Sequence, residues 1–203
     1  MIPIFKSLSS ELLPGADVFN MVDESLLCDI IRDGKLAAVT ARRLVGHVLS
    51  AEQAGAEFIM VTCSSMGRAV DASRTMCNAT VLRVDEPMAR KAVATGKRVG
   101  VIATLPSTLE PTVALIQSMS KDVRVISQLV EGAFEAVMSG NGAKHDALVG
   151  NALRELAGKS DVIVLAQASM ARVVESLPAA EKTVPILSSP RLAVEHLAGL
   201  IKS

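Results

Sequence analysis

The sequence predicts an α/β protein with two pseudo-symmetric lobes, each a small parallel sheet flanked by helices, and a cleft between them. Short apolar, β-branched runs alternate with longer patterned stretches, which is typical of parallel α/β proteins. In addition, residues 61–70 (VTCSSMGRAV) return as 165–174 (LAQASMARVV), which indicates an internal duplication. A chain of 203 residues with half its positions apolar can bury a sizeable core.

Six apolar runs are predicted to be the strands of the two sheets. Each run is rich in β-branched residues and is followed by a longer stretch with helical patterning, so the strands are expected to pair in parallel. In chain order they are 56–63 (AEFIMVTC), 79–84 (ATVLRV), 97–104 (KRVGVIAT), 121–127 (KDVRVIS), 160–166 (SDVIVLA) and 183–187 (TVPIL).

The stretch 40–55 (TARRLVGHVLSAEQAG) predicts an amphipathic helix between two of these strands. Leu44, Val45, Val48 and Leu49 share one helical face, with the charged residues largely outside it. Gly55 suits the C-terminal cap, because glycine readily adopts the positive φ with which many helices end. We expect this helix to cover one face of a sheet.

The two halves of the chain match well beyond the ten-residue repeat. The pair 22–24 (VDE) and 33–35 (DGK) in the first half corresponds to 130–132 (VEG) and 141–144 (NGAK) in the second. An apolar helical stretch lies between the members of each pair. The halves are therefore predicted to be two copies of one fold.

The first half is predicted to lack the strand that opens the second half. The segment 3–18, which opens with Pro3, matches 111–125, which opens with Pro111. A strand and loop at 97–110 lead into the second of these segments, and the first has no such segment before it. We expect a truncated chain or a misassigned start.

The duplication also divides the chain into domains. Residues 1–96 are predicted to form the first lobe and 97–187 the second, with a last helix at 188–203 crossing back to complete the first lobe. Ligands of parallel α/β sheets bind beyond the carboxyl ends of the strands. Cys63 and Gln167, which end equivalent strands, are therefore expected to meet across the cleft.

The composition argues against nucleic acid and membranes as partners. The chain has 21 basic and 21 acidic residues and no dense basic run that would attract a phosphate backbone or an anionic membrane. With no Trp, no Tyr and four Phe, it lacks stacking platforms for bases. The N-terminal stretch has no signal-peptide pattern, and no apolar run is long enough to span a membrane. We expect a soluble, cytoplasmic protein.

Sequence motifs for metals and nucleotide cofactors are missing. Cys28, Cys63 and Cys77 form no C-x-x-C pair and no His/Cys cluster, so neither a disulfide framework nor a metal site is expected. The triplet 95–97 (TGK) lacks the earlier glycine of a phosphate loop, and no G-x-G-x-x-G is present. We therefore expect no cofactor.

Cys63 is the candidate catalytic residue. It stands between a strand and a helix, where unpaired N–H groups and the helix dipole favour an anion and are expected to lower the thiol pKa. The next two residues, Ser64 and Ser65, offer donors suited to a carboxylate or an enolate oxygen. Further hydroxyls follow a strand of the other lobe, in the predicted loop 103–108: Thr104, Ser107 and Thr108. These donors predict a small carboxylate ligand.

A structural interpretation of the same residues stays open. On this alternative, Cys63 is a small buried apolar residue and Ser64 caps a helix. Cys28 and Cys77 are expected to be structural in either case. The three histidines, His47, His145 and His196, are expected on helix surfaces or in helix packing.

The stretches 61–74 (VTCSSMGRAVDASR), 99–112 (VGVIATLPSTLEPT) and 161–173 (DVIVLAQASMARV), together with the duplicated layout, carry a family resemblance. Along essentially its whole length the chain resembles the aspartate/glutamate/hydantoin racemase superfamily. The resemblance implies cofactor-independent chemistry by two cysteines, one per lobe, that flank the substrate Cα as acid and base. It assigns Cys63 to the first position and Gln167, which cannot abstract a proton, to the second. A homodimer is expected on the same ground.

Three functions remain open. The first is a racemase-like isomerase in which Cys63 exchanges the Cα proton of a small amino acid or related carboxylate. The second is a single-cysteine decarboxylase of a substituted malonate, or a cofactor-free isomerase, in which Cys63 protonates one face of an enediolate. The third is a protein that binds a small carboxylate without turnover. The expected substrate-binding residues are Ser64, Ser65, Thr104, Ser107, Thr108, Gln167, Ala168 and Ser169.

Overall fold

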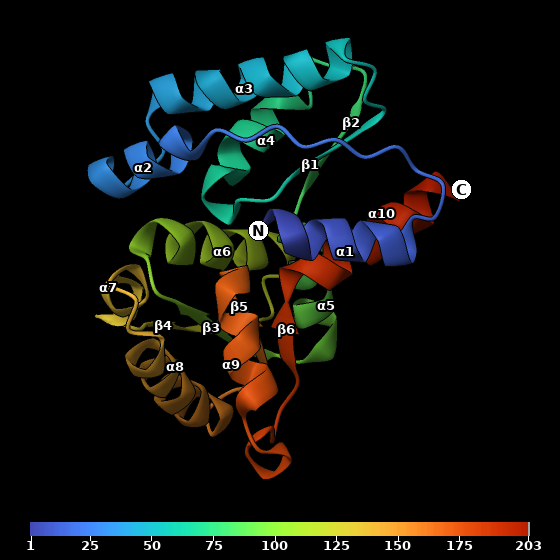
Figure 1. Cartoon of the computed structure of the whole chain (residues 1–203). Helices are drawn as coiled ribbons and strands as arrows, with labels where there is room; N and C mark the ends of the chain where they lie inside the picture. The colour runs from blue at the N-terminus through green and yellow to red at the C-terminus, as the bar shows by residue number, and fades with distance from the viewer. Residues whose placement is uncertain (203) are drawn as a thin grey trace. The chain divides into compact units, whose positions relative to one another are not determined.

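The computed structural model describes residues 1–202, which divide into two compact units (Figure 1). Unit 1 comprises residues 1–86 and the C-terminal segment from 190, and unit 2 comprises 87–189. The division falls at Glu86, whereas the sequence analysis placed it after residue 96, so helix α5 (Glu86–Thr95) belongs to unit 2 apart from its first residue. Within residues 1–202, no helix is both long and apolar enough to cross a membrane.

Unit 2 contains a parallel four-stranded sheet in the order β4-β3-β5-β6. Its strands are β3 (Arg98–Ala103), β4 (Arg124–Leu129), β5 (Val162–Leu165) and β6 (Ile186–Ser188). The central strand β3 pairs on both edges, with Val99 opposite Val125 on β4 and Val162 on β5. These strands confirm the last four of the six predicted from apolar runs.

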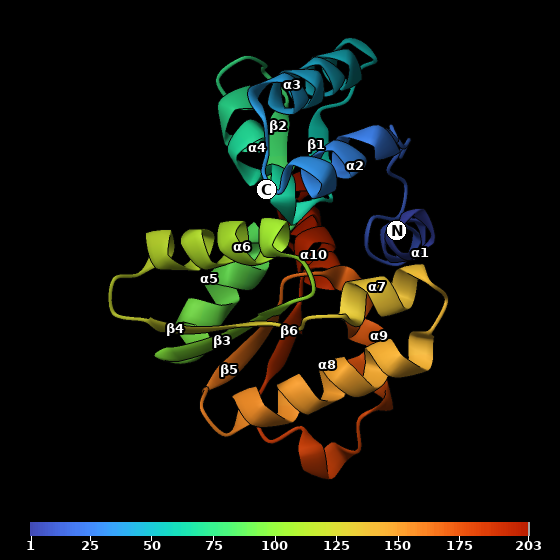
Figure 2. The same cartoon turned by 90° about the vertical axis from the view of Figure 1, so that its left-hand side faces the viewer.

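Helices cover both faces of this sheet. Figure 2 shows α6 (Pro106–Met119) on one face and α8 (Gly142–Ala157) on the other. Ile102 and Ile163 of the sheet are fully buried with Leu153 of α8 in one core. Burial from both sides explains why β5 is apolar at every position instead of alternating. The shorter elements are α7 (Ala133–Met138), η2 (Ala168–Met170), α9 (Ala171–Ser176) and η3 (Ala179–Glu181).

Unit 1 contains two parallel strands, β1 (Phe58–Val61) and β2 (Thr80–Arg83), which confirm the first two predicted strands. Successive side chains of a strand point to opposite faces. Ile59 accordingly packs into one core with Leu44, and Met60 into another with Phe5. The helices of this unit are α1 (Ile2–Leu12), α2 (Glu24–Asp33), α3 (Ala38–Gln53), α4 (Gly67–Ser73) and α10 (Ser189–Ile201).

Helix α3 confirms the helix predicted at 40–55. Of the four residues predicted for its apolar face, Leu44 and Val48 are buried, and Val45 and Leu49 are half-buried. At its end Gly55 adopts a φ of 92°, and the N–H of Ala56 donates to the carbonyl of Ala51 at 3.1 Å. This is a Schellman motif, so the glycine ends the helix as expected.

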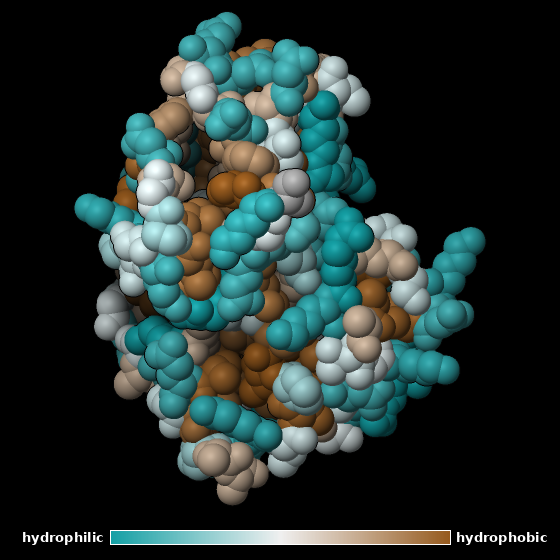
Figure 3. All heavy atoms as spheres, turned by 90° about the vertical axis from the view of Figure 1, so that its right-hand side faces the viewer, coloured by the Kyte–Doolittle hydropathy of each residue, from teal (hydrophilic) through white to brown (hydrophobic). Residues whose placement is uncertain are grey.

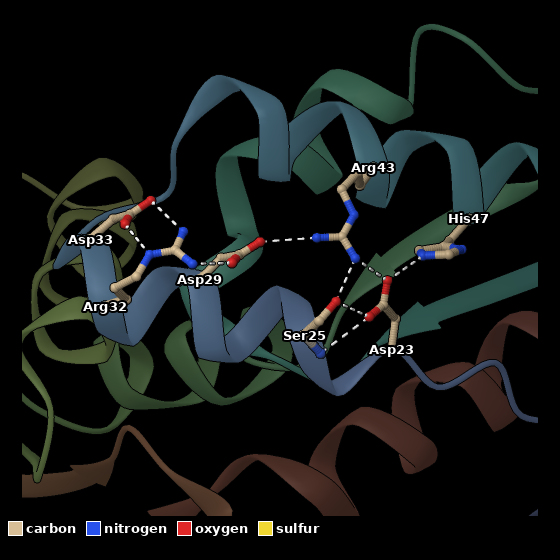
Figure 4. A network of polar contacts seen from close by, with 7 residues as sticks. All are labelled: Asp23, Ser25, Asp29, Arg32, Asp33, Arg43 and His47. Atoms are coloured by element: carbon tan, nitrogen blue, oxygen red, sulfur yellow. Dashed lines mark hydrogen bonds and ion pairs between the residues drawn. The ribbon is translucent and has the colours of Figure 1, made fainter.

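Polar contacts join α2 to α3, as Figure 4 shows. Asp23 caps α2 by accepting a hydrogen bond from the N–H of Ser25 at 3.1 Å. Its Oδ2 also accepts from Arg43 at 2.8 Å and lies 2.9 Å from Nε2 of His47. The hydrogen bonds from Ser25 and His47 lower the pKa of the Asp23 carboxyl. The carboxylate therefore holds the two helices together only while it is ionised.

The segment 16–22 (ADVFNMV) of unit 1 is neither helix nor strand. Its four large apolar side chains, at 18, 19, 21 and 22, are each at least 48% exposed. In Figure 2 it runs on the side of β1 away from β2. Among the described residues β1 pairs only with β2, which leaves its other edge unpaired. Hydrophobic side chains reach the surface elsewhere too, as brown groups between teal ones on the face in Figure 3.

Candidate active site

Cys63 stands at the carboxyl end of β1, where the sequence analysis expected it. It is half-buried and precedes the 3₁₀ turn η1 (Ser64–Met66), which leads into α4. Ser64 and Ser65 are buried, and the N–H of Met66 donates to the carbonyl of Cys63 at 3.1 Å. The structure therefore brings the predicted Cys63, Ser64 and Ser65 together in one short turn.

Three donors of this turn are directed at the sulfur of Cys63. They are the backbone N–H and the hydroxyl of Ser65 and the backbone N–H of Met66. Hydrogen bonds to sulfur favour the charged thiolate over the thiol. Ser65 thus hydrogen-bonds to the thiol itself, in addition to the ligand contact that the sequence analysis expected of it.

The expectation of a lowered Cys63 pKa is wrong. Burial of the thiol is the main cause that raises its pKa, and the negative charge of Asp85 adds to it. The hydrogen bonds from Ser65 and Met66 act in the opposite direction but do not outweigh burial. The helix that was expected to lower the pKa, α4, has seven residues and begins only at Gly67. The resting group near neutral pH is therefore the thiol.

A buried ion pair follows the neighbouring strand. Arg83 ends β2, and its Nε and Nη2 donate to the two carboxylate oxygens of Asp85 at 3.0 and 2.9 Å. Its Nη1 donates to Asp71 of α4 at 3.0 Å. Burial favours the neutral form of Arg83, but both carboxylates oppose it, and the pKa of the guanidinium is raised. The sequence analysis missed this pair, although opposite charges two positions apart at a strand end are a readable signal.

Gln167 ends β5 of unit 2, at the place in the repeat that Cys63 has in unit 1. Its Oε1 accepts hydrogen bonds from the backbone N–H and the hydroxyl of Thr104, at 2.6 and 3.0 Å. With that oxygen engaged, the carboxamide has only its N–H groups to offer a ligand. In the following turn η2, Ala168 is half-buried and Ser169 is exposed.

Two of the hydroxyls predicted in the loop 103–108 lie in a helix instead. Helix α6 begins at Pro106, so Ser107 and Thr108 belong to its first turn, and Pro111 lies inside it. Proline suits a helix start because its φ is already helical and no N–H partner is needed there. Thr108 is buried and Ser107 half-buried, whereas Thr104 lies before the helix and donates to Gln167 from both its backbone N–H and its hydroxyl.

The other two cysteines and His145 have the following environments. Cys28 is exposed on α2, whereas Cys77 is half-buried and donates to the carbonyl of Ser73. His145 is buried with its Nδ1 2.7 Å from Asp146, in the helix packing expected of it. Within residues 1–202, no three His, Cys, Asp or Glu side chains are grouped so that they could hold a metal.

Comparisons with known proteins agree with this fold. The sequence model of one family, described as Asp/Glu/Hydantoin racemase, matches residues 3–197. No curated protein matches the chain.

Three solved structures are similar in fold. An aspartate racemase homologue from Pyrococcus horikoshii has a TM-score of 0.71 at 13% identity, over 100% of this chain and 92% of that one. An allantoin racemase from Klebsiella pneumoniae has a TM-score of 0.68 at 18% identity, over 98% of this chain and 82% of that one. A glutamate racemase from Bacillus anthracis has a TM-score of 0.64 at 20% identity, over 82% of this chain and 66% of that one. The predicted α/β class, with two small parallel sheets flanked by helices, is confirmed.

Proposed function

Because the chain belongs to the Asp/Glu/hydantoin racemase family, we propose that it is an isomerase that moves the Cα proton of a small amino acid or related carboxylate without a cofactor. Cys63 is the proposed proton carrier. The observation that supports this role is the place of Cys63 just beyond the carboxyl end of β1, before a turn in which hydrogen bonds from Ser65 and Met66 favour the thiolate.

Proton exchange uses both forms of the thiol. In the thiolate form the sulfur takes the Cα proton, and the C–H electron pair passes into the substrate carboxylate as an enediolate. The new S–H bond then breaks as the proton returns to carbon. Ser65 and Met66 stabilise the thiolate during this exchange, while burial keeps it scarce at neutral pH. The exchange rate is therefore expected to rise as the pH increases.

Gln167 takes a binding role in this proposal. A carboxamide cannot accept the Cα proton, and the hydrogen bonds from Thr104 hold its oxygen. Its N–H groups are suited to donate to a carboxylate. Cys63 then exchanges the proton on one face of Cα, and the inversion that an isomerase carries out needs in addition an acid that delivers a proton to the opposite face.

The two alternatives gain no support from the comparisons. The family match and the three structures above are described as racemases or a racemase homologue, and none is described as a decarboxylase. A binding protein without turnover differs from the proposal in one measurable respect. It leaves the Cα proton in place.

Proton NMR in D₂O tests the proposal. Both enantiomers of aspartate and glutamate, allantoin, simple hydantoins and a substituted malonate are incubated with the protein, and the Cα proton signal is followed. We expect loss of the signal with the native chain and with Cys77→Ala, the matched control at a second half-buried cysteine. Cys63→Ala should slow the exchange by about 10²-fold or more.

Three outcomes would overturn the proposal. Unchanged exchange in Cys63→Ala would remove Cys63 from the chemistry. A ligand that stabilises the native chain and Cys63→Ala equally, with no exchange in either, would establish the binding role instead. Loss of CO₂ from the malonate would establish the decarboxylase.

A further inference from the structure

Asp85 lies beside Cys63 because of the register between β1 and β2. Val61 pairs with Arg83, and the N–H of Val84 donates to the carbonyl of Val61 at 3.2 Å. Both strands end at this pair: Cys63 keeps an extended backbone two residues after Val61, outside the sheet. Val84 and Asp85 form a turn directly after Arg83. Arg83, which belongs to the paired strand, fixes the Asp85 carboxylate, and the negative charge of that carboxylate acts on the thiol. The carboxylate and the thiol therefore lie at the same carboxyl end of the two paired strands.

A glycine makes room for the arginine that holds this carboxylate. A Cβ on Gly67 would lie 2.3 to 2.7 Å from three guanidinium atoms of Arg83. A side chain at this position would displace the guanidinium, because Cβ atoms do not approach other atoms so closely. Gly67 follows directly on Ser65 and Met66, the residues whose donors reach the sulfur. Arg83 thus packs against the turn that holds the thiol.

Unit 2 lacks this arrangement at the place where it lacks the cysteine. The register of β5 and β6 pairs Leu165 with Ser188, as that of β1 and β2 pairs Val61 with Arg83. Counted along the repeat and this register, the second copy of the repeat has Gln167, Ala171, Ser188 and Pro190 where the first copy has Cys63, Gly67, Arg83 and Asp85. The Arg83–Asp85 ion pair and Gly67 are therefore present in the copy of the repeat that has the cysteine, and both are absent from the copy that has Gln167.

We propose that Arg83 and Asp85 are positioning residues for Cys63, in which Arg83 holds the Asp85 carboxylate beside the thiol and offsets its negative charge. The inference rests on the proposed role of Cys63 in proton exchange. The charged groups linked to this pair are Arg83 and Asp85 from the end of β2, Asp71 from α4, Arg74, which also pairs with Asp71, and Glu86, which pairs with Arg74. Two carboxylates thus share one guanidinium, and removing either partner of the pair changes the charge that the thiol experiences.

The pH dependence of alkylation by iodoacetamide, read at each cysteine by mass spectrometry, tests this without any substrate. Asp85→Asn removes a negative charge and should move the alkylation midpoint of Cys63 to lower pH, with a rate at pH 7.5 about tenfold higher. Arg83→Met leaves the Asp85 charge unbalanced and should move the midpoint to higher pH, with a similar fall in rate. The double variant Arg83→Met/Asp85→Asn should return close to the native midpoint.

The controls separate a charge effect from damage to the fold. Cys28, exposed on α2, should react alike in every variant. Arg83→Lys keeps the positive charge and should keep the midpoint near the native one, which covers the case in which Arg83→Met does not fold. Shifts of both single variants in the same direction, or faster reaction at every pH with no shift of the midpoint, would overturn the inference.

The same experiment distinguishes failure of this inference from failure of the proposed function. Opposite shifts in a protein that exchanges no Cα proton would support the pair and reject the isomerase. Proton exchange that depends on Cys63, with alkylation midpoints unmoved in all variants, would reject the pair and keep the isomerase.

Discussion

Units 1 and 2 repeat one structural plan but bury the corresponding strands to different extents. All four residues of β5 are buried, and β5 pairs with β3 and β6. All four residues of β1 are only half-buried, and within the described chain β1 pairs with β2 alone. The segment 16–22, which matches β4 in the repeat, stays unpaired. An apolar run is thus enough to form a strand, but its burial depends on a partner at each edge.

The largest effect is expected from supplying a strand to the unpaired edge of β1. Glu57 and Val61 accept hydrogen bonds from β2, so Phe58 and Met60 point to the opposite edge. A copy of 97–110 joined ahead of Pro3 reproduces the order that unit 2 has ahead of Pro111. It should slow amide exchange at Phe58 and Met60 by about a hundredfold, or nearly 3 kcal/mol of local opening free energy, in NMR hydrogen exchange.

The control for this fusion carries Val101→Pro in the added copy, because proline cannot donate to the sheet. It should leave both amides as they are in the native chain. Equal protection in the two fusions would show that the added segment does not pair as a strand. The unequal burial of β1 and β5 would then need another cause.

A smaller effect is expected from exchanging the residue that begins the helix after each strand. Gly67→Ala places a Cβ against the guanidinium of Arg83 and should destabilise unit 1 by about 1–3 kcal/mol. Ala171→Gly makes the reverse change at the start of α9 and should cost less than about 1 kcal/mol. Urea denaturation, followed by hydrogen exchange in peptides of each unit, measures both. A similar loss of stability in Gly67→Ala and Ala171→Gly would mean that the Arg83 side chain moves aside without destabilising unit 1.

The smallest effect is expected from the half-buried carboxylates Asp23 in unit 1 and Asp161 in unit 2. Hydrogen bonds from Ser25 and His47 lower the pKa of Asp23, and those from Arg98 lower the pKa of Asp161. A carboxyl whose folded pKa lies below its unfolded value, near 4, adds stability above that pH and loses it on acidification. Asp23→Asn should therefore weaken the acid dependence of stability in unit 1, and Asp161→Asn in unit 2.

Hydrogen exchange of peptides from α3 and α8 across pH 2 to 6 reads the two units separately. Each variant serves as the control for the other, since its change lies in a different unit. Asp23→Asn with an unaltered acid dependence in α3 would contradict the role of this carboxylate in joining α2 to α3.

Local patterns predicted the secondary structure well. The six strands and the helix at 40–55 follow from runs of apolar residues and from Gly55, since both signals depend on neighbours in the chain. The loop predicted at 103–108 is too long, because α6 begins at Pro106, whereas Pro111 lies inside the helix. Either proline fits a helix start, and the local sequence does not decide between them.

The candidate site divides in the same way. By itself the sequence determined that Cys63 and Gln167 end equivalent strands, because the repeat and the strand pattern are both written along the chain. Only the tertiary structure decided that the pKa of Cys63 is raised, that Gln167 accepts from Thr104, and that Arg83 and Asp85 form a buried pair. Burial depends on residues that lie far apart in sequence, as do the hydrogen bonds between Thr104 and Gln167, and such residues meet only when strands pair and helices pack on them.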